Sequence, residues 1–309
     1  MNELTDANNL SHVDTDSKHK GDAFVETIEE LRPVDPRAVE FMKLSRRVCL
    51  IRRKRGMSAT GFLVGPDLML TSAHALLGTS AIFADPDEVT VLFDQFIWDK
   101  KKQTRAKGDS CGLRHIPFTH QPDVVGSSIK VDRRSKRRFD DNGLDYILVR
   151  LDRPMGLGFL PFSHRIRGWN NCSRADAPAA GRVLVVQHPQ GDLLQFAEGN
   201  IPEKHVDRDF PYLFRYSTKT LNGSSGAPVY DEKRRVVGIH IGERSTTEQL
   251  GVSFQRIFED LENDGVKLPP FRLTHEVMDS IFGSSLTERK RHRGHDWRGD
   301  RLFDDIDYD

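Results

Sequence analysis

Residues 221–228 of this 309-residue chain read LNGSSGAP, a G-x-S-G-x-P motif between the apolar runs 212–216 and 236–241. A serine hydroxyl is a weak nucleophile unless its surroundings activate it. Glycines on both sides of Ser225 permit a tight turn that exposes its hydroxyl. They also allow the backbone amides of Gly223 and Ser225 to point at one spot, as a developing oxyanion requires. Because Gly, Ser and Pro also cluster in ordinary turns, the motif needs support from elsewhere in the chain.

Two further stretches supply that support. Residues 60–74, TGFLVGPDLMLTSAH, predict a strand, a Gly-Pro-Asp turn, a second strand and a corner of small residues that carries His74. Residues 143–151, GLDYILVRL, place Asp145 directly before an apolar strand. The order His, Asp, Ser along the chain is one of the three known orders of the catalytic triad.

The three blocks resemble the active-site blocks of chymotrypsin-like (trypsin-fold) serine peptidases, especially bacterial ones, over roughly residues 45–265. The resemblance implies an all-β fold of two packed antiparallel β-barrels with the active site between them and short flanking helices at both ends. In such a site Ser225 would attack the scissile carbonyl, His74 would take and return the proton, and Asp145 would orient the imidazole. The amides of Gly223 and Ser225 would form the oxyanion hole.

Each of these residues also has an interpretation without catalysis. The chain contains 12 histidines, most of which must be surface or structural residues. Asp145 alone could be a turn residue or a strand cap, and Ser224 competes with Ser225 as nucleophile, although it occupies the x position of the motif. The alternative function is therefore a catalytically inactive trypsin-fold module that binds a protein through its cleft or its C-terminal tail.

Residues near the motif bear on substrate choice. Lys219 stands six residues before Ser225, where trypsins carry an acidic residue, so cleavage after Arg or Lys is not expected by that route. Bacterial glutamyl endopeptidases instead have a threonine five residues before the nucleophile and a G-I-H strand whose histidine lies fifteen after it. Thr220 and His240 match these positions and could donate hydrogen bonds to a substrate carboxylate. The resemblance implies a preference for glutamate at P1; the alternative is a turn threonine and a buried strand histidine.

The composition excludes several classes of protein. Lys plus Arg and Asp plus Glu both total 46, so the net charge gives no reason to expect a nucleic-acid or membrane partner. The sequence shows neither a signal peptide nor a stretch long and apolar enough to span a bilayer. The cysteines are odd in number and widely spaced, which predicts free thiols at Cys49, Cys111 and Cys172. We therefore expect a cytoplasmic protein without a metal or cofactor.

Short apolar runs separated by turn residues run through the chain and predict an all-β sandwich or barrel. The expected strands are residues 48–51, 89–93, 146–151, 183–186, 193–196, 213–216 and 236–241, with helices at 23–32, 37–46 and 257–261. The expected organisation is a disordered segment 1–22, a helical lead-in 23–46, a peptidase domain 47–265 with its inter-barrel boundary near 154–161, and a partly flexible extension 266–309.

Basic clusters at 100–102 and 133–138 lie in a long polar region between the His74 and Asp145 blocks. Such clusters could bind nucleic acid or an acidic partner. The region has few aromatic residues on which bases could stack, so we expect solvated loops.

These observations predict a bacterial serine endopeptidase that cleaves protein or peptide substrates through an acyl-enzyme. The chain is similar to the trypsin-like peptidase modules that bacteria keep inside the cell, often as effectors in stress or defence. That similarity implies limited proteolysis, and it leaves room for a regulatory protein partner.

Overall fold

The computed structural model describes residues 36–54, 58–77, 84–95, 98–99, 104–105, 108–114, 123–127, 144–158, 166–172, 180–203 and 211–270. The chain divides into two compact units, Met1–Met42 and Lys43–Asp309. Helix α2 (Pro36–Ser45) begins in the first unit, and its bounds confirm the helix predicted at 37–46. The helix predicted at 23–32, the basic clusters and the chain beyond residue 270 lie outside the described residues.

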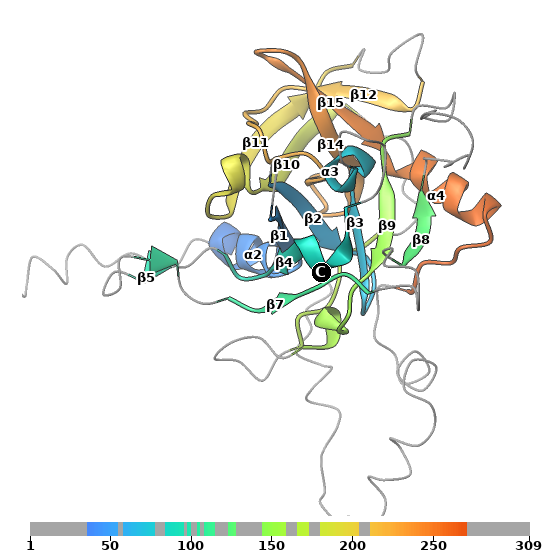
Figure 1. The fold of residues 1–309 in the computed structure, drawn as a ribbon. Helices are drawn as coiled ribbons and strands as arrows, with labels where there is room; N and C mark the ends of the chain where they lie inside the picture. The colour runs from blue at the N-terminus through green and yellow to red at the C-terminus, as the bar shows by residue number, and fades with distance from the viewer. Residues whose placement is uncertain are drawn as a thin grey trace, which may run out of the picture. The chain divides into compact units, whose positions relative to one another are not determined.

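Seven strands of the second unit form one antiparallel sheet in the order β7-β4-β1-β2-β3-β9-β8 (Figure 1). Their bounds are β1 (Val48–Arg53), β2 (Ala59–Leu63), β3 (Leu68–Thr71), β4 (Val89–Leu92), β7 (Ser110–Cys111), β8 (Val124–Ser127) and β9 (Ile147–Arg150). The two edges meet where the amide of Asp123, before β8, donates to the carbonyl of Arg114, after β7, at 2.7 Å. This hydrogen bond joins the two edges, so the curled sheet closes into a barrel.

Six further strands form a second antiparallel sheet in the order β11-β10-β13-β14-β15-β12. Their bounds are β10 (Gly181–Gln187), β11 (Gln195–Ile201), β12 (Leu213–Tyr216), β13 (Pro228–Tyr230), β14 (Val236–Ser245) and β15 (Glu248–Ser253). Its edges are joined by Asn200 and Ser217, whose backbones exchange hydrogen bonds of 3.1 and 2.9 Å. The prediction of two antiparallel β-barrels with short flanking helices is therefore confirmed.

The remaining elements are short. They are the hairpin β5 (Trp98–Asp99) and β6 (Thr104–Arg105), helices α3 (Ala73–Leu76) and α4 (Phe254–Asn263), and the 3₁₀ turns η1 (Pro86–Glu88), η2 (Met155–Leu157) and η3 (Pro189–Gly191). Helix α4 buries Phe254, Ile257 and Leu261, whose spacing places them on one helical face. Within the described part of the chain, no helix has the length and apolar character needed to cross a membrane.

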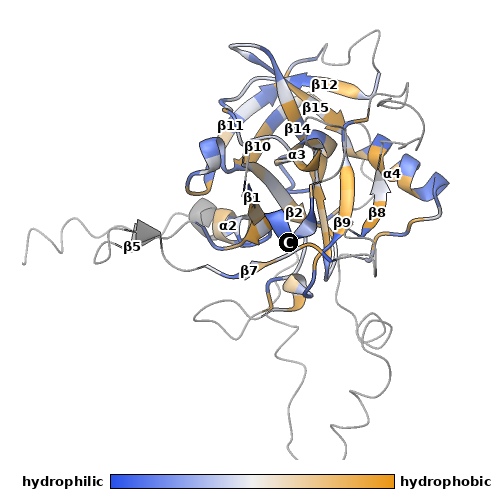
Figure 2. Ribbon diagram, in the orientation of Figure 1, coloured by the Kyte–Doolittle hydropathy of each residue, from blue (hydrophilic) through white to orange (hydrophobic). Residues whose placement is uncertain are grey.

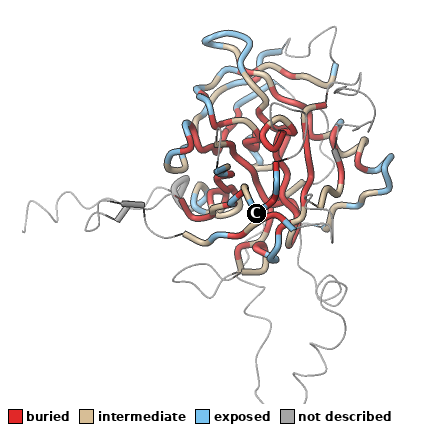
Figure 3. Tube along the Cα trace, viewed as in Figure 1, coloured by how far each residue is buried: buried red, intermediate tan, exposed pale blue. Residues whose placement is uncertain are grey.

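The strands alternate their side chains between the barrel interior and its surface, as a period of two residues requires. In the first barrel the core includes Cys49 and Ile51 of β1, together with Ile147 and Val149 of β9. Strand β9 is apolar along nearly its whole length, and three of its four residues are buried (Figures 2 and 3). A separate core fills the second barrel and contains Val183, Val185, Phe214, Tyr216, Val229 and Val237. All three cysteines are free thiols, as predicted.

A buried ion pair holds the connection between the barrels against the first barrel. The guanidinium of Arg167 is fully buried and donates to both carboxylate oxygens of Asp94 at 2.8 Å each. It also donates to the carbonyl of Arg46 at 2.7 Å and lies 4.8 Å from the centre of the Phe93 ring. Because a buried charge is costly unless it is paired and hydrogen-bonded, this set of contacts gives the connection one position.

Candidate active site

His74 lies in the short helix α3, directly after β3. Strand β3 ends at Thr71, and Ser72 keeps an extended backbone before the helix turn begins. Ala73 and Ala75 are buried on either side of the histidine, whereas 37% of the His74 side chain is exposed. The small, apolar neighbours therefore leave the imidazole as the group that this corner presents to solvent.

Asp145 reaches His74 because β3 and β9 are paired. Their antiparallel register matches Thr71 with Ile147, so a continuation of that register by two residues brings Asp145 beside the start of α3. The Asp145 carboxylate accepts a hydrogen bond from Nδ1 of His74 and another, of 3.0 Å, from the His74 backbone amide. A carboxylate can only accept, so in the neutral imidazole the proton lies on Nδ1 and Nε2 is left as an acceptor.

The segment that carries Asp145 is anchored on both sides. Leu144 and Tyr146 are buried, and the Tyr146 hydroxyl donates to the Asp260 carboxylate of α4 at 2.5 Å. Burial, reinforced by this hydrogen bond to Asp260, raises the pKa of Tyr146 well above its ordinary value, so the phenol stays protonated and remains a donor. The helix that follows β15 thus helps to position the carboxylate that orients His74.

The Ser225 loop is held by the first barrel. The amide of Thr60, in β2, donates to the Ser225 carbonyl at 2.9 Å, and the Thr60 hydroxyl donates to the Gly223 carbonyl at 2.8 Å. The same hydroxyl accepts from the His188 amide at 2.9 Å. Ser225 itself is half-buried. One threonine therefore ties together the nucleophile loop, β2 and the turn after β10.

Gly226 brings this loop against the end of β3. Its φ is +85°, and a Cβ there would lie 2.1 Å from the Thr71 hydroxyl and 2.3 Å from the Thr60 carbonyl oxygen. Only glycine tolerates both the backbone conformation and the contact. The loop thus packs against Thr71, which precedes His74 by three residues along the chain. None of the hydrogen bonds among the described residues joins the Ser225 hydroxyl to the His74 ring, so that contact stays a prediction. Hydrogen bonds between catalytic groups are often long when no substrate is bound.

The peptide between Asn222 and Gly223 has an orientation that suits an oxyanion hole. The Asn222 carbonyl accepts a hydrogen bond from the Gln190 amide. In a trans peptide the N–H points opposite to the C=O, so the Gly223 N–H points away from the Gln190 turn. Neither Gly223 nor Ser225 uses its amide to bond another described residue. Gly223 has φ +96°, and a Cβ would lie 2.7 Å from the His188 carbonyl, so a side chain there would disturb the loop.

The comparisons with known proteins identify the family of this chain. A family model described as a trypsin-like peptidase domain matches residues 59–239, a span that contains His74, Asp145 and Ser225. This chain belongs to the trypsin-like peptidase family. No curated protein sequence gave a significant match to the peptidase.

The solved structures to which this chain is similar are distant in sequence. A Glu endopeptidase in complex with MPD is 16% identical, with a TM-score of 0.50 over 72% of this chain and 90% of that chain. The active form of the Rv3671c protease from M. tuberculosis is also 16% identical, with a TM-score of 0.45 over 78% of this chain and 94% of that chain. At this level of identity the likeness to the Glu endopeptidase concerns the fold alone.

Burial distinguishes the two serines of the peptidase motif. Ser224 is fully buried, and its hydroxyl accepts a hydrogen bond of 3.2 Å from the Leu221 amide. Ser225 is the more accessible of the two. Ser224 thus supports the loop from within, whereas Ser225 remains available to a substrate.

We expect Ser224→Ala to retain most of the activity of the peptidase while lowering its free energy of unfolding by about 1 kcal/mol, the usual net worth of one hydrogen bond. Peptide cleavage and urea denaturation measure the two effects. Ser225→Ala should instead remove cleavage. An inactive Ser224→Ala together with an active Ser225→Ala would reverse the assignment of the nucleophile.

The two predicted specificity residues are both buried, with 5% of Thr220 and 2% of His240 exposed. The Thr220 hydroxyl lies 2.6 Å from Oε1 of Gln249 and 3.4 Å from Oε1 of Glu243. Nδ1 of His240 lies 2.8 Å from the Tyr216 hydroxyl. Burial lowers the pKa of His240 to about 3, with the charge of His74 as a second cause. The imidazole of His240 is therefore neutral at neutral pH.

Three of these neighbours were not predicted from the sequence: Tyr216, Glu243 and Gln249. A signal for the last two is the hairpin of β14 and β15, whose register places Glu243 opposite Gln249. Recognising that hairpin in the sequence would have placed these two side chains opposite each other, although it would not have placed them beside Thr220.

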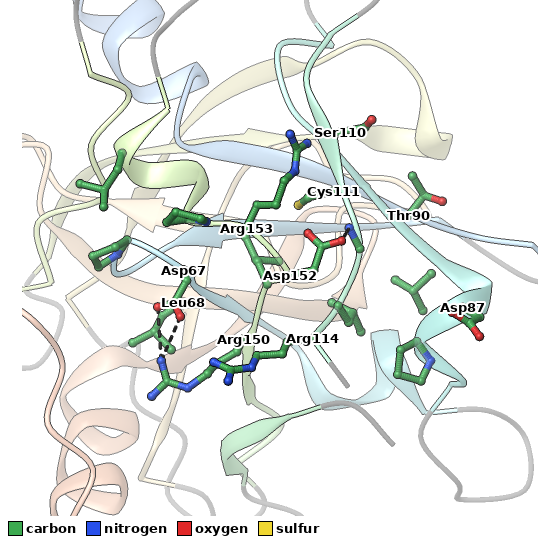
Figure 4. A pocket seen from close by; sticks show the side chains of 18 of the residues that line it. Asp67, Leu68, Asp87, Thr90, Ser110, Cys111, Arg114, Arg150, Asp152 and Arg153 are labelled. Atoms are coloured by element: carbon green, nitrogen blue, oxygen red, sulfur yellow. Dashed lines mark hydrogen bonds and ion pairs between the residues drawn. The ribbon is translucent and has the colours of Figure 1, made fainter. Parts of the chain in front are cut away.

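A cavity of about 960 Å³ lies elsewhere, on the first barrel (Figure 4). Asp67, Arg150 and Asp152 are among its lining residues, and Arg150 pairs with Asp67 at 3.1 Å. Neither the triad candidates nor the predicted specificity residues line it. This cavity is therefore separate from the candidate active site.

Proposed function

We propose that this chain is a serine endopeptidase that cleaves protein substrates through an acyl-enzyme. The observation that carries the proposal is the pair of hydrogen bonds by which Asp145 holds both the Nδ1 and the backbone amide of His74. The Ser225 loop packs against the strand that leads to His74. A nucleophile, a base with a defined tautomer and an orienting carboxylate are the groups that acyl transfer requires.

In the proposed reaction Ser225 Oγ attacks the scissile carbonyl while Nε2 of His74 takes its proton. Asp145 stabilises the resulting imidazolium without itself becoming protonated. The amides of Gly223 and Ser225 bind the oxyanion of the tetrahedral intermediate. His74 then protonates the leaving amine, and a water molecule activated by the same imidazole releases the acyl group from Ser225.

The competing function is a trypsin-fold module that binds a protein without cutting it. The intact set of His74, Asp145 and Ser225 favours the enzyme. Digestion of a peptide library, with cleavage products identified by mass spectrometry, separates the two functions. Cleavage that Ser225→Ala lacks supports the peptidase, whereas no cleavage by either folded protein supports the binding module.

The predictions about origin, location, role and substrate preference rest on the resemblance of the sequence to bacterial trypsin-fold peptidases. A bacterial origin, a cytoplasmic location, an effector role in stress or defence and a regulatory protein partner are retained as parts of the proposal. The preference for glutamate at P1 also stays a prediction. A neutral His240 and a carboxylate beside Thr220 weigh against that preference, and they lead to a different substrate class.

A further inference from the structure

We call Thr220, His240, Glu243 and Gln249, together with Tyr216, the S1 site. The Thr220 hydroxyl contacts Gln249 and Glu243. Gln249 is paired in the sheet with Tyr216, whose hydroxyl contacts His240. The group lies directly beside the nucleophile loop. The Gly226 amide donates to the His240 carbonyl at 2.8 Å, and the His240 amide donates to the Ala227 carbonyl at 2.8 Å. His240 is thus paired with the two residues that follow Ser225.

Tyr216 determines what His240 can offer a ligand. The phenol is almost fully buried, and burial raises its pKa, so it keeps its proton. Its hydrogen-bond partner among the described residues is Nδ1 of His240, at 2.8 Å. A buried hydroxyl proton without an acceptor is costly, so we assign the phenol as donor and Nδ1 as acceptor. The neutral ring of His240 then carries its proton on Nε2. Among the described residues Nε2 has no partner, so it can donate one uncharged N–H.

The Thr220 oxygen and the Glu243 carboxylate offer acceptors. The Thr220 hydroxyl has one proton, and the short distance of 2.6 Å to Gln249 shows where that proton is used. The Glu243 carboxylate lies 3.4 Å from the same hydroxyl. A substrate carboxylate placed here would meet a like charge and no formal positive charge on His240, which makes its burial costly.

We propose, given the peptidase function, that the S1 site selects an uncharged primary amide at P1, and specifically a glutamine side chain. The carbonyl oxygen of a glutamine accepts from Nε2 of His240. Its NH₂ group donates to the Glu243 carboxylate and to the Thr220 oxygen. Thr220 and His240 are both buried, so the longer side chain of glutamine reaches them better than that of asparagine. Tyr216 acts as a positioning residue, because it selects the tautomer of His240.

The test is a set of peptides that differ only at P1, with Gln, Glu, Asn, Leu or Lys. Glutamate has nearly the same shape as glutamine, so the comparison isolates charge and hydrogen bonding. We expect kcat/KM for Gln to exceed that for Glu by at least about tenfold, and to exceed those for Asn and Leu. A preference for Glu, Leu or Asn overturns the inference. A preference for Lys also overturns it, because Glu243 would then act as a counterion for a basic side chain.

Two variants examine the individual roles. Glu243→Gln removes the charge but keeps the shape, and it should lower the Gln-to-Glu ratio about tenfold. Tyr216→Phe should lower the same ratio about fivefold, because Nδ1 loses its donor and the Nε2–H tautomer is no longer favoured. An equal loss of kcat/KM for the Gln and Glu peptides would mark Tyr216 as structural and contradict its positioning role. An unchanged ratio in Glu243→Gln would contradict the role of the carboxylate.

Labelling of Ser225 with a fluorophosphonate probe separates the inference from the proposed function. A protein that is labelled at Ser225 but shows no preference for glutamine overturns the inference alone. Absence of both labelling and cleavage overturns the proposed function, and the inference with it.

Discussion

Replacing Asp145 with asparagine should lower kcat/KM about 10⁴-fold, the loss that the wrong histidine tautomer causes in a Ser-His-Asp triad. The geometry gives the reason. One carboxylate oxygen accepts from the His74 backbone amide at 3.0 Å, and the other accepts from Nδ1. An asparagine would keep its oxygen on the backbone amide and turn its NH₂ toward Nδ1. Nδ1 would then have to accept, so the ring proton would move to Nε2 and block the removal of the Ser225 proton.

The measurement is kcat/KM on one cleaved peptide, with circular dichroism to verify the fold. Asp152→Asn is the matched control, because Asp152 is exposed and accepts one backbone hydrogen bond, of 2.9 Å from Gly112, away from the site. Its activity should stay within about twofold of the wild type, as for ordinary surface substitutions. A loss below tenfold in Asp145→Asn would contradict the orienting role.

Replacing Gly226 with alanine should lower the free energy of unfolding by about 4 kcal/mol, as the sum of backbone strain and overpacking. The new Cβ would lie 2.1 Å from the Thr71 hydroxyl and 2.3 Å from the Thr60 carbonyl, at a φ of +85°. Neither β2 nor β3 can withdraw without disturbing the core of the first barrel. The Ser225 loop would move away from His74, so activity should fall together with stability.

Urea denaturation measures this effect, and Gly242→Ala provides the matched control. A Cβ at Gly242 meets no atom within 4 Å, so its cost should be well below 1 kcal/mol. Equal stability of the two alanine variants would contradict the close packing of the Ser225 loop against β3.

Much of the fold could be predicted because three local motifs identify it. Strand β12 was predicted within its observed bounds, and β9 within one residue at each end. Strand β11 was predicted at 193–196 but lies at Gln195–Ile201, where polar, exposed residues (Gln195, Glu198 and Asn200) interrupt the apolar ones. The hydrogen bonds to β10 define β11 as a strand. Its residues lack the alternation of apolar and polar side chains from which a strand could have been predicted. Strand β15 was missed for the same reason at its polar start.

The candidate site, like the fold, could be predicted only in part from the sequence. Asp145 and His74 meet because of a register that two apolar strands determine, and both strands were recognisable in the sequence. The environment of His240 depends on side chains from β12, β14 and β15, which only the closed second barrel brings together. Tyr216 was assigned to a strand from its pattern, but its contact with His240 spans 24 residues along the chain. A single sequence gives no sign of such a non-local contact.

The central claim is that Ser225 is a nucleophile activated by His74, and covalent labelling tests it most directly. A fluorophosphonate probe reacts with an activated serine and leaves ordinary hydroxyls unmodified. The account predicts one adduct per chain, located by mass spectrometry on Ser225, absent in Ser225→Ala and strongly reduced in His74→Ala. A folded wild-type protein that takes up no probe, or a Ser225→Ala protein that is labelled as fast as the wild type, would contradict it.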